Sequence, residues 1–356
     1  MNQEWRTFLE SQQATITNEG NAEFPTPLIE SCQAALNGNS LIELSHLGLL
    51  KVTGEENKKF LQGQLTCNTE TVTEANSVLG TYCNLKGRAH SSFRVFQRDE
   101  DLYLLMDRQL VPVMIELLKK YIVFSKAELA DASDELIVLG LAGTGATEFL
   151  SDFYNYDSAN SELMQRHSNT QVIQHLTARE NLHPALYLTI STPNEAINLW
   201  KNFSPNATTA SKNSWDLLLT NAGEAQVNIN SKELFIPLEL NLQALNYIDF
   251  KKGCYTGQEI IARLYYRGKA KQRLYIADVN CQQLPTENDS VYVADGNSQA
   301  AGHVVNAAWN APNQATILAV IKNDVALSQT LKINLSDDPN LQVRDVPYAI
   351  TNEEDE

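Results

Sequence analysis

The chain has 356 residues, of which 43 are acidic and 27 are basic, so its formal net charge is −16 at pH 7 and its isoelectric point lies near 4.8. This balance excludes a protein that coats duplex DNA or an anionic membrane, because such binding depends on Lys and Arg side chains that neutralise phosphates. A hydrophobic content of 43% excludes a largely disordered chain, and the length predicts two or three domains.

The first 38 residues are rich in Gln, Asn, Thr and Pro, and they predict a loosely packed lead-in with one short helix. Residues 1–10 lack the apolar run of a secretory signal, and no run of about 18 apolar residues predicts a membrane span. The five cysteines are odd in number and widely spaced, which does not fit a disulfide framework. We therefore expect a cytoplasmic protein that does not contact membranes.

The core is predicted to begin at Leu41, with strands and helices in irregular alternation. Phe60, Leu61 and Leu65 share one face of a helical pattern that opens after Gly54. Strands are expected at 41–44, 49–53, 78–82, 93–96 and 136–141, a polar turn at 83–88, a long amphipathic helix at 110–122, and an insertion or loop at 151–181. This order favours an α+β fold over a doubly wound sheet.

After Arg273 the pattern changes to short apolar segments about ten residues apart, separated by turn residues. The segments are 274–279, 290–294, 302–307, 315–321, 331–334 and 341–344. Such spacing predicts a small antiparallel barrel or sandwich. The acidic end, 351–356, is expected to be a solvated tail.

The segment from Lys251 to Arg263 carries the strongest chemical signal. Thr256 and Glu259 stand just before two isoleucines in a capping-box pattern, which predicts a helix starting near Gly257. Cys254 then precedes the positive end of a helix dipole, beside two lysines. These conditions lower the pKa of a thiol and make it a nucleophile.

Two other interpretations of Cys254 stay open at this point. A single Cys in a turn is often a small buried side chain, and the helix start alone can bind an anion while the thiol takes no part. No Cys-x-x-Cys occurs in the chain, so a resident metal or iron–sulfur cluster is not expected. Any metal contact of Cys254 would be transient or shared with a partner protein.

Basic residues are concentrated around this cysteine. Residues 251–273 contain seven basic side chains and one acidic side chain, a net charge of +6, so the rest of the chain carries −22. Three tyrosines lie among them, at positions 255, 265 and 266, and a fourth follows at position 275. This mixture fits single-stranded nucleic acid, a small aromatic anion with a carboxylate tail, or a solvated helix face.

The octapeptide Lys-Gly-Cys-Tyr-Thr-Gly-Gln-Glu at 252–259 resembles the signature of the YgfZ family. These folate-binding proteins, also called tRNA-modifying proteins, are similar to the T-protein (aminomethyltransferase) of the glycine cleavage system. Further similar blocks cover 52–54 with 60–66, 121–126, and 235–237 with 241–245, so that the resemblance extends over about residues 40–350.

The resemblance implies two interlocked α+β modules and a small C-terminal antiparallel β-barrel around a central opening. It implies a tetrahydrofolate-type cofactor, and a role in assembly or repair of iron–sulfur clusters in client enzymes and thereby in tRNA methylthiolation. Cys254 and Lys252 would be the functional residues, and Trp215 a folate contact. Lys251, Arg263 and Arg267 are the candidates for holding the folate tail.

Two positions depart from the family pattern. A second folate-contacting aromatic residue is replaced by Leu47. Ser91 and Ser92 stand where T-proteins carry paired aspartates, one of which exchanges a proton with the folate. A hydroxyl near its ordinary pKa does not replace a carboxylate in proton transfer, so we do not expect aminomethyl transfer of the T-protein type.

We therefore predict a lead-in (1–38), a T-protein-like folate-binding region (39–265), a C-terminal β-barrel (266–350) and a tail (351–356). The expected partners are folate and iron–sulfur client or assembly proteins, with no direct nucleic-acid binding and a monomeric state. The alternatives are a folate-dependent one-carbon transferase and a direct tRNA-binding module.

Overall fold

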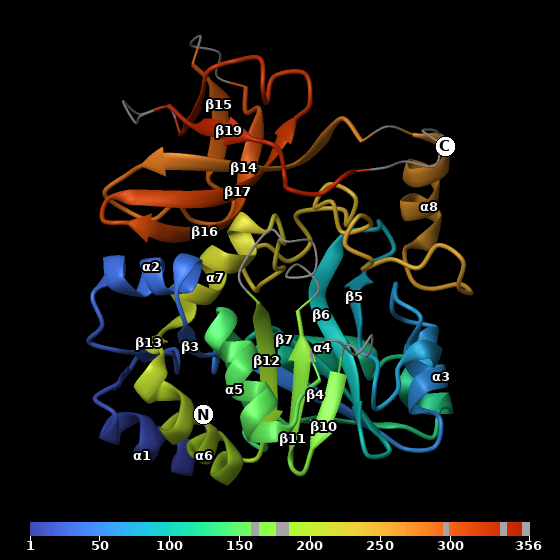
Figure 1. Ribbon diagram of the computed structural model, residues 1–356. Coiled ribbons are helices and arrows are strands. Elements are labelled where there is room, and N and C mark those ends of the chain that lie inside the picture. Colours follow the sequence, from blue (N-terminus) through green and yellow to red (C-terminus); the bar gives the residue numbers. More distant parts are fainter. Residues whose placement is uncertain (158–163, 176–184, 269, 295–298, 335–339, 351–356) are drawn as a thin grey trace. The chain divides into compact units, whose positions relative to one another are not determined.

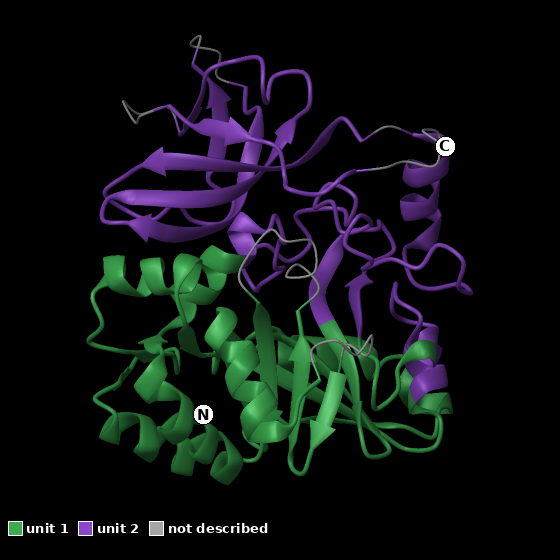
Figure 2. Ribbon diagram, viewed as in Figure 1, with its two compact units in different colours: residues 1–57, 71–77, 94–218 green, residues 58–70, 78–93, 219–356 purple. Residues whose placement is uncertain are grey.

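The computed structural model describes all residues except 158–163, 176–184, 269, 295–298, 335–339 and 351–356, so the predicted tail lies outside the described residues. The chain forms two compact units, each built from several chain segments (Figure 2). Unit 1 contains residues 1–57, 71–77 and 94–218, and unit 2 contains residues 58–70, 78–93 and 219–356. The predicted domain boundaries at 38 and 265 stay predictions.

Figure 1 labels the helices and strands. The helices are α1 (Gln3–Ser11), α2 (Leu28–Asn37), α3 (Asn57–Gln62), α4 (Leu110–Leu118), α5 (Thr144–Tyr154), α6 (Pro193–Phe203), α7 (Lys212–Asn221) and α8 (Gln258–Arg267), with short 3-10 turns η1 (Thr69–Thr71), η2 (Ile122–Phe124) and η4 (Ser204–Asn206). No helix among the described residues has the length and apolar character needed to cross a membrane.

Most strands of unit 1 belong to a six-stranded sheet with the order β10-β11-β12-β9-β3-β13 and to a second sheet with the order β5-β6-β7-β4-β8. β6 starts in unit 2 and ends in unit 1, where residues 94–98 pair with β7. The strands are β1 (Thr15–Ile16), β2 (Ala22–Glu23), β3 (Ser40–Glu43), β4 (Leu47–Thr53), β5 (Val78–Cys83), β6 (Ala89–Arg98), β7 (Asp101–Asp107), β8 (Glu128–Asp131), β9 (Ile137–Ala142), β10 (Met164–His167), β11 (Thr170–Gln174), β12 (Leu186–Ser191) and β13 (Thr208–Ala210).

The N-terminal residues are part of the core of unit 1. Trp5 and Leu9, one helical turn apart on α1, are fully buried in a cluster with Leu141 of β9 and Trp200 of α6. The indole of Trp5 donates a hydrogen bond to the buried carboxylate of Glu43 on β3, at 3.1 Å. The expectation of a loosely packed lead-in with one helix was therefore wrong. The composition of residues 1–38 is polar on average, but the few apolar residues of α1 lie on one face of the helix and are buried.

Two other expectations also needed correction. The region 151–181 is not a plain insertion, because β10 and β11 form an antiparallel hairpin on the edge of the six-stranded sheet. The helix expected at 110–122 ends at Leu118 and is followed by the turn η2. The strands predicted from 41 to 141 are confirmed, with ends shifted by a few residues.

The C-terminal part of unit 2 is an antiparallel six-stranded sheet with the order β18-β15-β16-β17-β14-β19. All six predicted segments are strands. Alternate residues of β14, namely Tyr275, Ala277 and Val279, belong to the buried core of this sheet. They are β14 (Gln272–Asn280), β15 (Ser290–Val293), β16 (Gly302–Ala311), β17 (Gln314–Lys322), β18 (Leu331–Ile333) and β19 (Gln342–Arg344). The predicted antiparallel C-terminal module is confirmed.

Candidate functional site

The loop from Asp249 to Gly257, here called the signature loop, lies in unit 2 and leads into α8. The Asp249 carboxylate accepts hydrogen bonds from the amides of Lys251, at 2.8 Å, and Lys252, at 3.1 Å. The Asp249 amide donates to the carbonyl of Thr66, at 3.0 Å. An aspartate that binds amides two and three residues ahead fixes a turn, and here it also ties the turn to a distant segment.

Lys252 anchors the signature loop to residues 62–67. The residue is 9% exposed, and its ammonium donates to the carbonyls of Gln62, at 2.7 Å, Leu65, at 2.6 Å, and Cys67, at 2.8 Å. Gln62 is the last residue of α3, where unpaired carbonyls favour a cation. All three N–H donors of the ammonium are therefore engaged by main-chain oxygens, which makes Lys252 an anchor of the loop.

The electrostatic environment of this anchor is unusual. Burial lowers the pKa of Lys252 to about 8, although Cys67 and Asp249 nearby raise it. Burial also raises the pKa of the Cys67 thiol to about 12, so this thiol stays neutral beside the ammonium. The ammonium lies 5.4 Å from the centre of the Tyr255 ring, which supplies a cation–π contact.

Tyr255 is the second buried anchor of the signature loop. Its side chain is 7% exposed, and its hydroxyl has no hydrogen-bond partner among the described residues. Burial raises the pKa of this phenol, with smaller contributions from Cys83 and Asp249. The buried residues 252 and 255 thus hold both sides of the dipeptide Gly253-Cys254, which is exposed.

Cys254 is the exposed member of the five cysteines, all of which lie in the described residues and form no disulfide there. Cys32, Cys67 and Cys83 are buried, and Cys281 is partly exposed. The interpretation of Cys254 as a small buried side chain is therefore wrong. Its activation by the helix start stays a prediction.

The start of α8 is close to the predicted one, but its cap is different. The helix begins at Gln258, and its N-cap is Gly257 with φ +83°, without a side-chain capping bond. The predicted capping box at Thr256 was wrong because Gly257 itself turns the chain. A Cβ atom at Gly257 would lie 2.5 Å from the carbonyl oxygen of Asn84, so only glycine fits this close approach.

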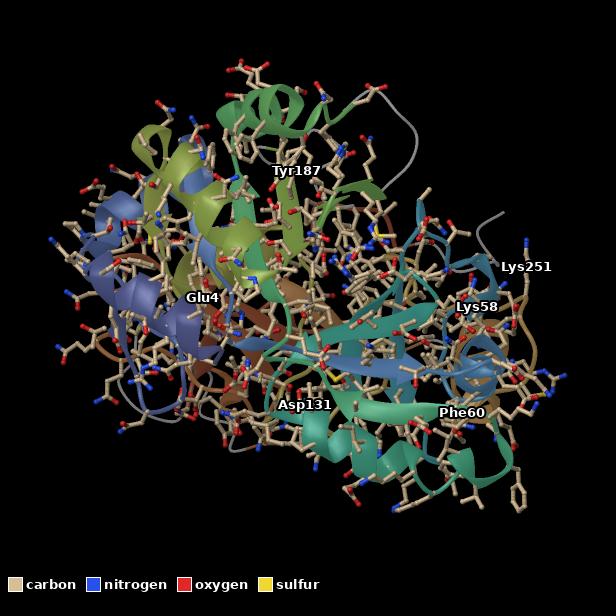
Figure 3. All side chains as sticks on the ribbon, turned by 90° about the horizontal axis from the view of Figure 1, so that it is seen from below. Glu4, Lys58, Phe60, Asp131, Tyr187 and Lys251 are labelled. Atoms are coloured by element: carbon tan, nitrogen blue, oxygen red, sulfur yellow. The ribbon has the colours of Figure 1, made fainter. Side chains whose placement is uncertain are left out.

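The predicted tail-binding cations lie on the same stretch of chain. Lys251 in the loop and Arg263 and Arg267 on α8 are exposed, and none of them forms an ion pair within the described part of the chain. Figure 3 shows the Lys251 side chain extending away from the ribbon. Beside them, the rings of Phe250 and Tyr265 stack with centres 3.8 Å apart.

The two predicted pterin contacts belong to unit 1, and Cys254 and the predicted cations belong to unit 2 (Figure 2 colours the units). Trp215 of α7 is 3% exposed, and a Cβ atom at Gly140 would lie 2.8 Å from its ring. The ring also meets that of His175 edge to face, at 5.8 Å. Leu47, the first residue of β4, is partly exposed.

These residues fit a folate unequally. Exposed, unpaired guanidinium and ammonium groups match the carboxylates of a folate tail. An aromatic ring that stacks on a pterin needs an open face, whereas Trp215 is packed by protein and Leu47 is aliphatic. Among the described residues, no group of three or more His, Cys, Asp or Glu side chains can hold a metal ion.

Ser91 and Ser92, which replace the T-protein aspartates, are buried in β6. The Ser92 hydroxyl accepts a hydrogen bond from the amide of Val227, at 2.9 Å, and the Ser91 hydroxyl donates to the carbonyl of Ser92, at 3.3 Å. Both hydroxyls thus bind main-chain groups, as structural side chains do.

The sequence interpretation did not single out Asp249, and it named Tyr255 only as one of four tyrosines near the basic residues. The spacing of Asp249 before Lys251 and Lys252 is typical of an Asx turn and was an available signal. The role of Tyr255 as a buried anchor beside Lys252 had no such signal, because the carbonyls that hold Lys252 come from residues 62–67.

Comparisons with known proteins show the family and support the fold. The GCVT N-terminal domain family matches residues 9–180. The tRNA-modifying protein YgfZ of Pectobacterium carotovorum subsp. carotovorum (strain PC1) is 32% identical, over 91% of this chain and 95% of its own. The tRNA-modifying protein YgfZ of Yersinia enterocolitica is 31% identical, over 91% and 96%.

A solved structure supports the fold over nearly the whole chain. The glycine cleavage system aminomethyltransferase T from Bartonella henselae matches with a TM-score of 0.73 and 12% identity, over 96% of this chain and 95% of its own. The predicted T-protein-like α+β fold is thereby confirmed. At this identity the likeness concerns the fold alone.

Proposed function

Because the chain belongs to the family of tRNA-modifying YgfZ proteins, we propose that it supports tRNA modification as a folate-binding accessory protein of the cytoplasm. Its finer role is to assist the assembly or repair of iron–sulfur clusters in client enzymes, among them those that methylthiolate tRNA. The observation that carries this proposal is the exposed thiol of Cys254 between two buried anchors.

The geometry suits a thiol that acts on another molecule. Lys252 and Tyr255 fix the loop on both sides, so that Cys254 reaches solvent without losing a defined position. In the proposed role Cys254 is the nucleophile presented to a client protein or a transient metal ligand. The folate would be held by its carboxylates at Lys251, Arg263 and Arg267.

The test of Cys254 uses cells whose own copy of the gene is deleted and replaced by variants. We expect Cys254→Ala to lower methylthiolated tRNA, measured by mass spectrometry, to the level of the deletion strain. Cys281→Ala is the matched control, because this partly exposed cysteine directly follows β14 of the C-terminal sheet. A normal level with Cys254→Ala, in a protein that remains folded, would remove Cys254 from the function.

Folate binding is tested separately, by titrating tryptophan fluorescence with tetrahydrofolate. Charge reversal at Arg263 and Arg267 should weaken binding by about tenfold or more, because charge-assisted bonds to carboxylates contribute about 1.5–3 kcal/mol each. The four tryptophans make the signal composite, so Trp215→Phe is measured in parallel. Saturation that is identical in the wild type and the charge-reversed variant would contradict the assignment of the tail site.

The alternative of a one-carbon transferase has less support. T-proteins carry aspartates for proton transfer where this chain has Ser91 and Ser92. The hydroxyls of these serines bind main-chain groups. Turnover of methylene-tetrahydrofolate with an amine acceptor by the purified protein would favour it.

A further inference from the structure

Two neighbouring elements of unit 2 expose apolar side chains to solvent. Leu85, at the tip of the turn between β5 and β6, is 81% exposed. On α8, Ile260 is 37% exposed and Tyr266 is 43% exposed. Single exposed apolar residues are common, but apolar side chains exposed on two adjoining elements are typical of interaction sites.

The turn and the helix are in direct contact. A Cβ atom at Gly87 would lie 3.1 Å from the Cβ of Ile260, and the carbonyl of Asn84 meets Gly257. Figure 1 shows α8 beside the ends of β5 and β6. Leu85 is therefore next to the first turn of α8, immediately after the signature loop.

The exposed residues of α8 lie on one side of the helix. They are Glu259, Ile260, Arg263, Tyr266 and Arg267, which fall on one face at 100° per residue. Ile261, on the opposite face, is fully buried. We call the set of Leu85, Ile260, Arg263, Tyr266 and Arg267 the α8 surface.

Charge and chemistry limit what this surface binds. Arg263 and Arg267, with Lys251 and Lys86 beside them, form no ion pair within the described residues, and Glu259 is the one carboxylate on this face of α8. The complementary partner is acidic. Leu85 and Ile260 offer neither stacking nor hydrogen bonds to a base, so an apolar protein surface complements them better than RNA does.

We propose that the α8 surface docks an acidic client protein, whose contact region has an apolar centre surrounded by carboxylates, and so brings the client to Cys254. Tyr and Arg are the side chains that most often dominate the energy of such interfaces. The rest of the chain carries a charge of −22 and repels an acidic partner. The +6 segment attracts that partner, so the charge distribution also directs the partner to this surface as the two proteins associate. This inference rests on the function proposed above.

The test places a carboxylate in the centre of the patch. Leu85→Asp and, independently, Ile260→Asp are expressed in the deletion strain, with Ile29→Asp as the control, because Ile29 is a 47% exposed apolar residue on α2 of unit 1. We expect both α8-surface variants to lower methylthiolated tRNA by about tenfold or more. Ile29→Asp should retain it, and Leu85→Asp should bind tetrahydrofolate as the wild type does.

The outcomes separate the two proposals. If Cys254→Ala lowers the modification but both α8-surface variants keep it, docking at this surface is wrong and the proposed function stands. If Cys254→Ala has no effect, the proposed function fails first. Thermal unfolding checks that the two α8-surface variants are as stable as the wild type. If one variant is destabilised, the result of the other variant tests the proposal.

A photocrosslinking residue at position 85 identifies the chemistry of the partner in cells. We expect a crosslinked protein that Ile260→Asp removes, that Lys86→Glu weakens, and that survives ribonuclease treatment, because neither residue is assigned to the folate. A product that ribonuclease removes would show that the surface binds RNA and would overturn the proposal. A protein product that is insensitive to both substitutions would overturn it as well.

Discussion

At the scale of single residues, Lys252 of the signature octapeptide has a structural role, because it holds the signature loop in place. Its ammonium binds three main-chain carbonyls and does not reach solvent as a free nucleophile. Cys254, two positions later, is exposed. The division of roles between the two side chains follows from the alternation of buried and exposed positions along the loop.

Lys252 also predicts a pH dependence of stability. Its pKa is about 8 in the folded protein and about 10.5 in the unfolded chain, so between these values the unfolded chain binds more protons. The contribution of Lys252 to the free energy of unfolding therefore rises with pH from about 8 to 10.5. Urea unfolding of the wild type and Lys252→Met at a series of pH values measures it.

Lys252→Met serves as the reference because other groups oppose this trend. The buried thiols of Cys67 and Cys83 have pKa values raised to about 12, so their contribution to stability falls as pH rises above about 9. The difference between wild type and variant isolates the lysine. A difference that does not change with pH would contradict the assigned pKa.

At the scale of elements, the junction of the signature loop and α8 depends on one glycine. Gly257→Ala should lower the free energy of unfolding by about 1–3 kcal/mol, because it combines a left-handed φ of +83° with a contact of 2.5 Å to the carbonyl of Asn84. Chemical denaturation measures the change.

Gly253→Ala is the matched control for that substitution, since a Cβ atom there meets nothing within 4 Å. It should change stability by less than about 0.5 kcal/mol. If both variants were equally stable, the close contact at Gly257 would not constrain the helix start.

At the scale of the whole molecule, the N-terminal helix is a structural part of unit 1. Trp5 and Leu9 fill a core that also contains residues of β9 and α6, and Trp5 donates a hydrogen bond to buried Glu43. Burial raises the pKa of Glu43, while its bonds to Ser45 and Trp5 lower it. Loss of the indole donor leaves a buried carboxyl group with one partner fewer.

Trp5→Ala should therefore destabilise the protein by about 3–5 kcal/mol, as other truncations of large buried aromatic residues do. Thermal unfolding followed by circular dichroism measures the loss, with Phe8→Ala as a partly exposed neighbour for comparison. An unchanged unfolding temperature would mean that the N-terminal helix does not contribute to the core.

The sequence alone determined the features that depend on local periodicity and local motifs. The six C-terminal strands, the helix start near Gly257 and the membership of the family followed from alternating apolar residues and from one octapeptide. Such patterns report which face of an element is buried, because side chains repeat with the period of the backbone.

Only the tertiary structure decided what each signature residue touches. The carbonyls that bind Lys252 come from residues 62–67, the contact that requires Gly257 comes from Asn84, and the buried partner of Trp5 is on β3. These partners are 38 to 190 residues away along the chain. Their meeting depends on long-range packing, which local periodicity does not encode. The sequence therefore indicated Cys254 as the candidate residue, and the fold determined how its loop is held.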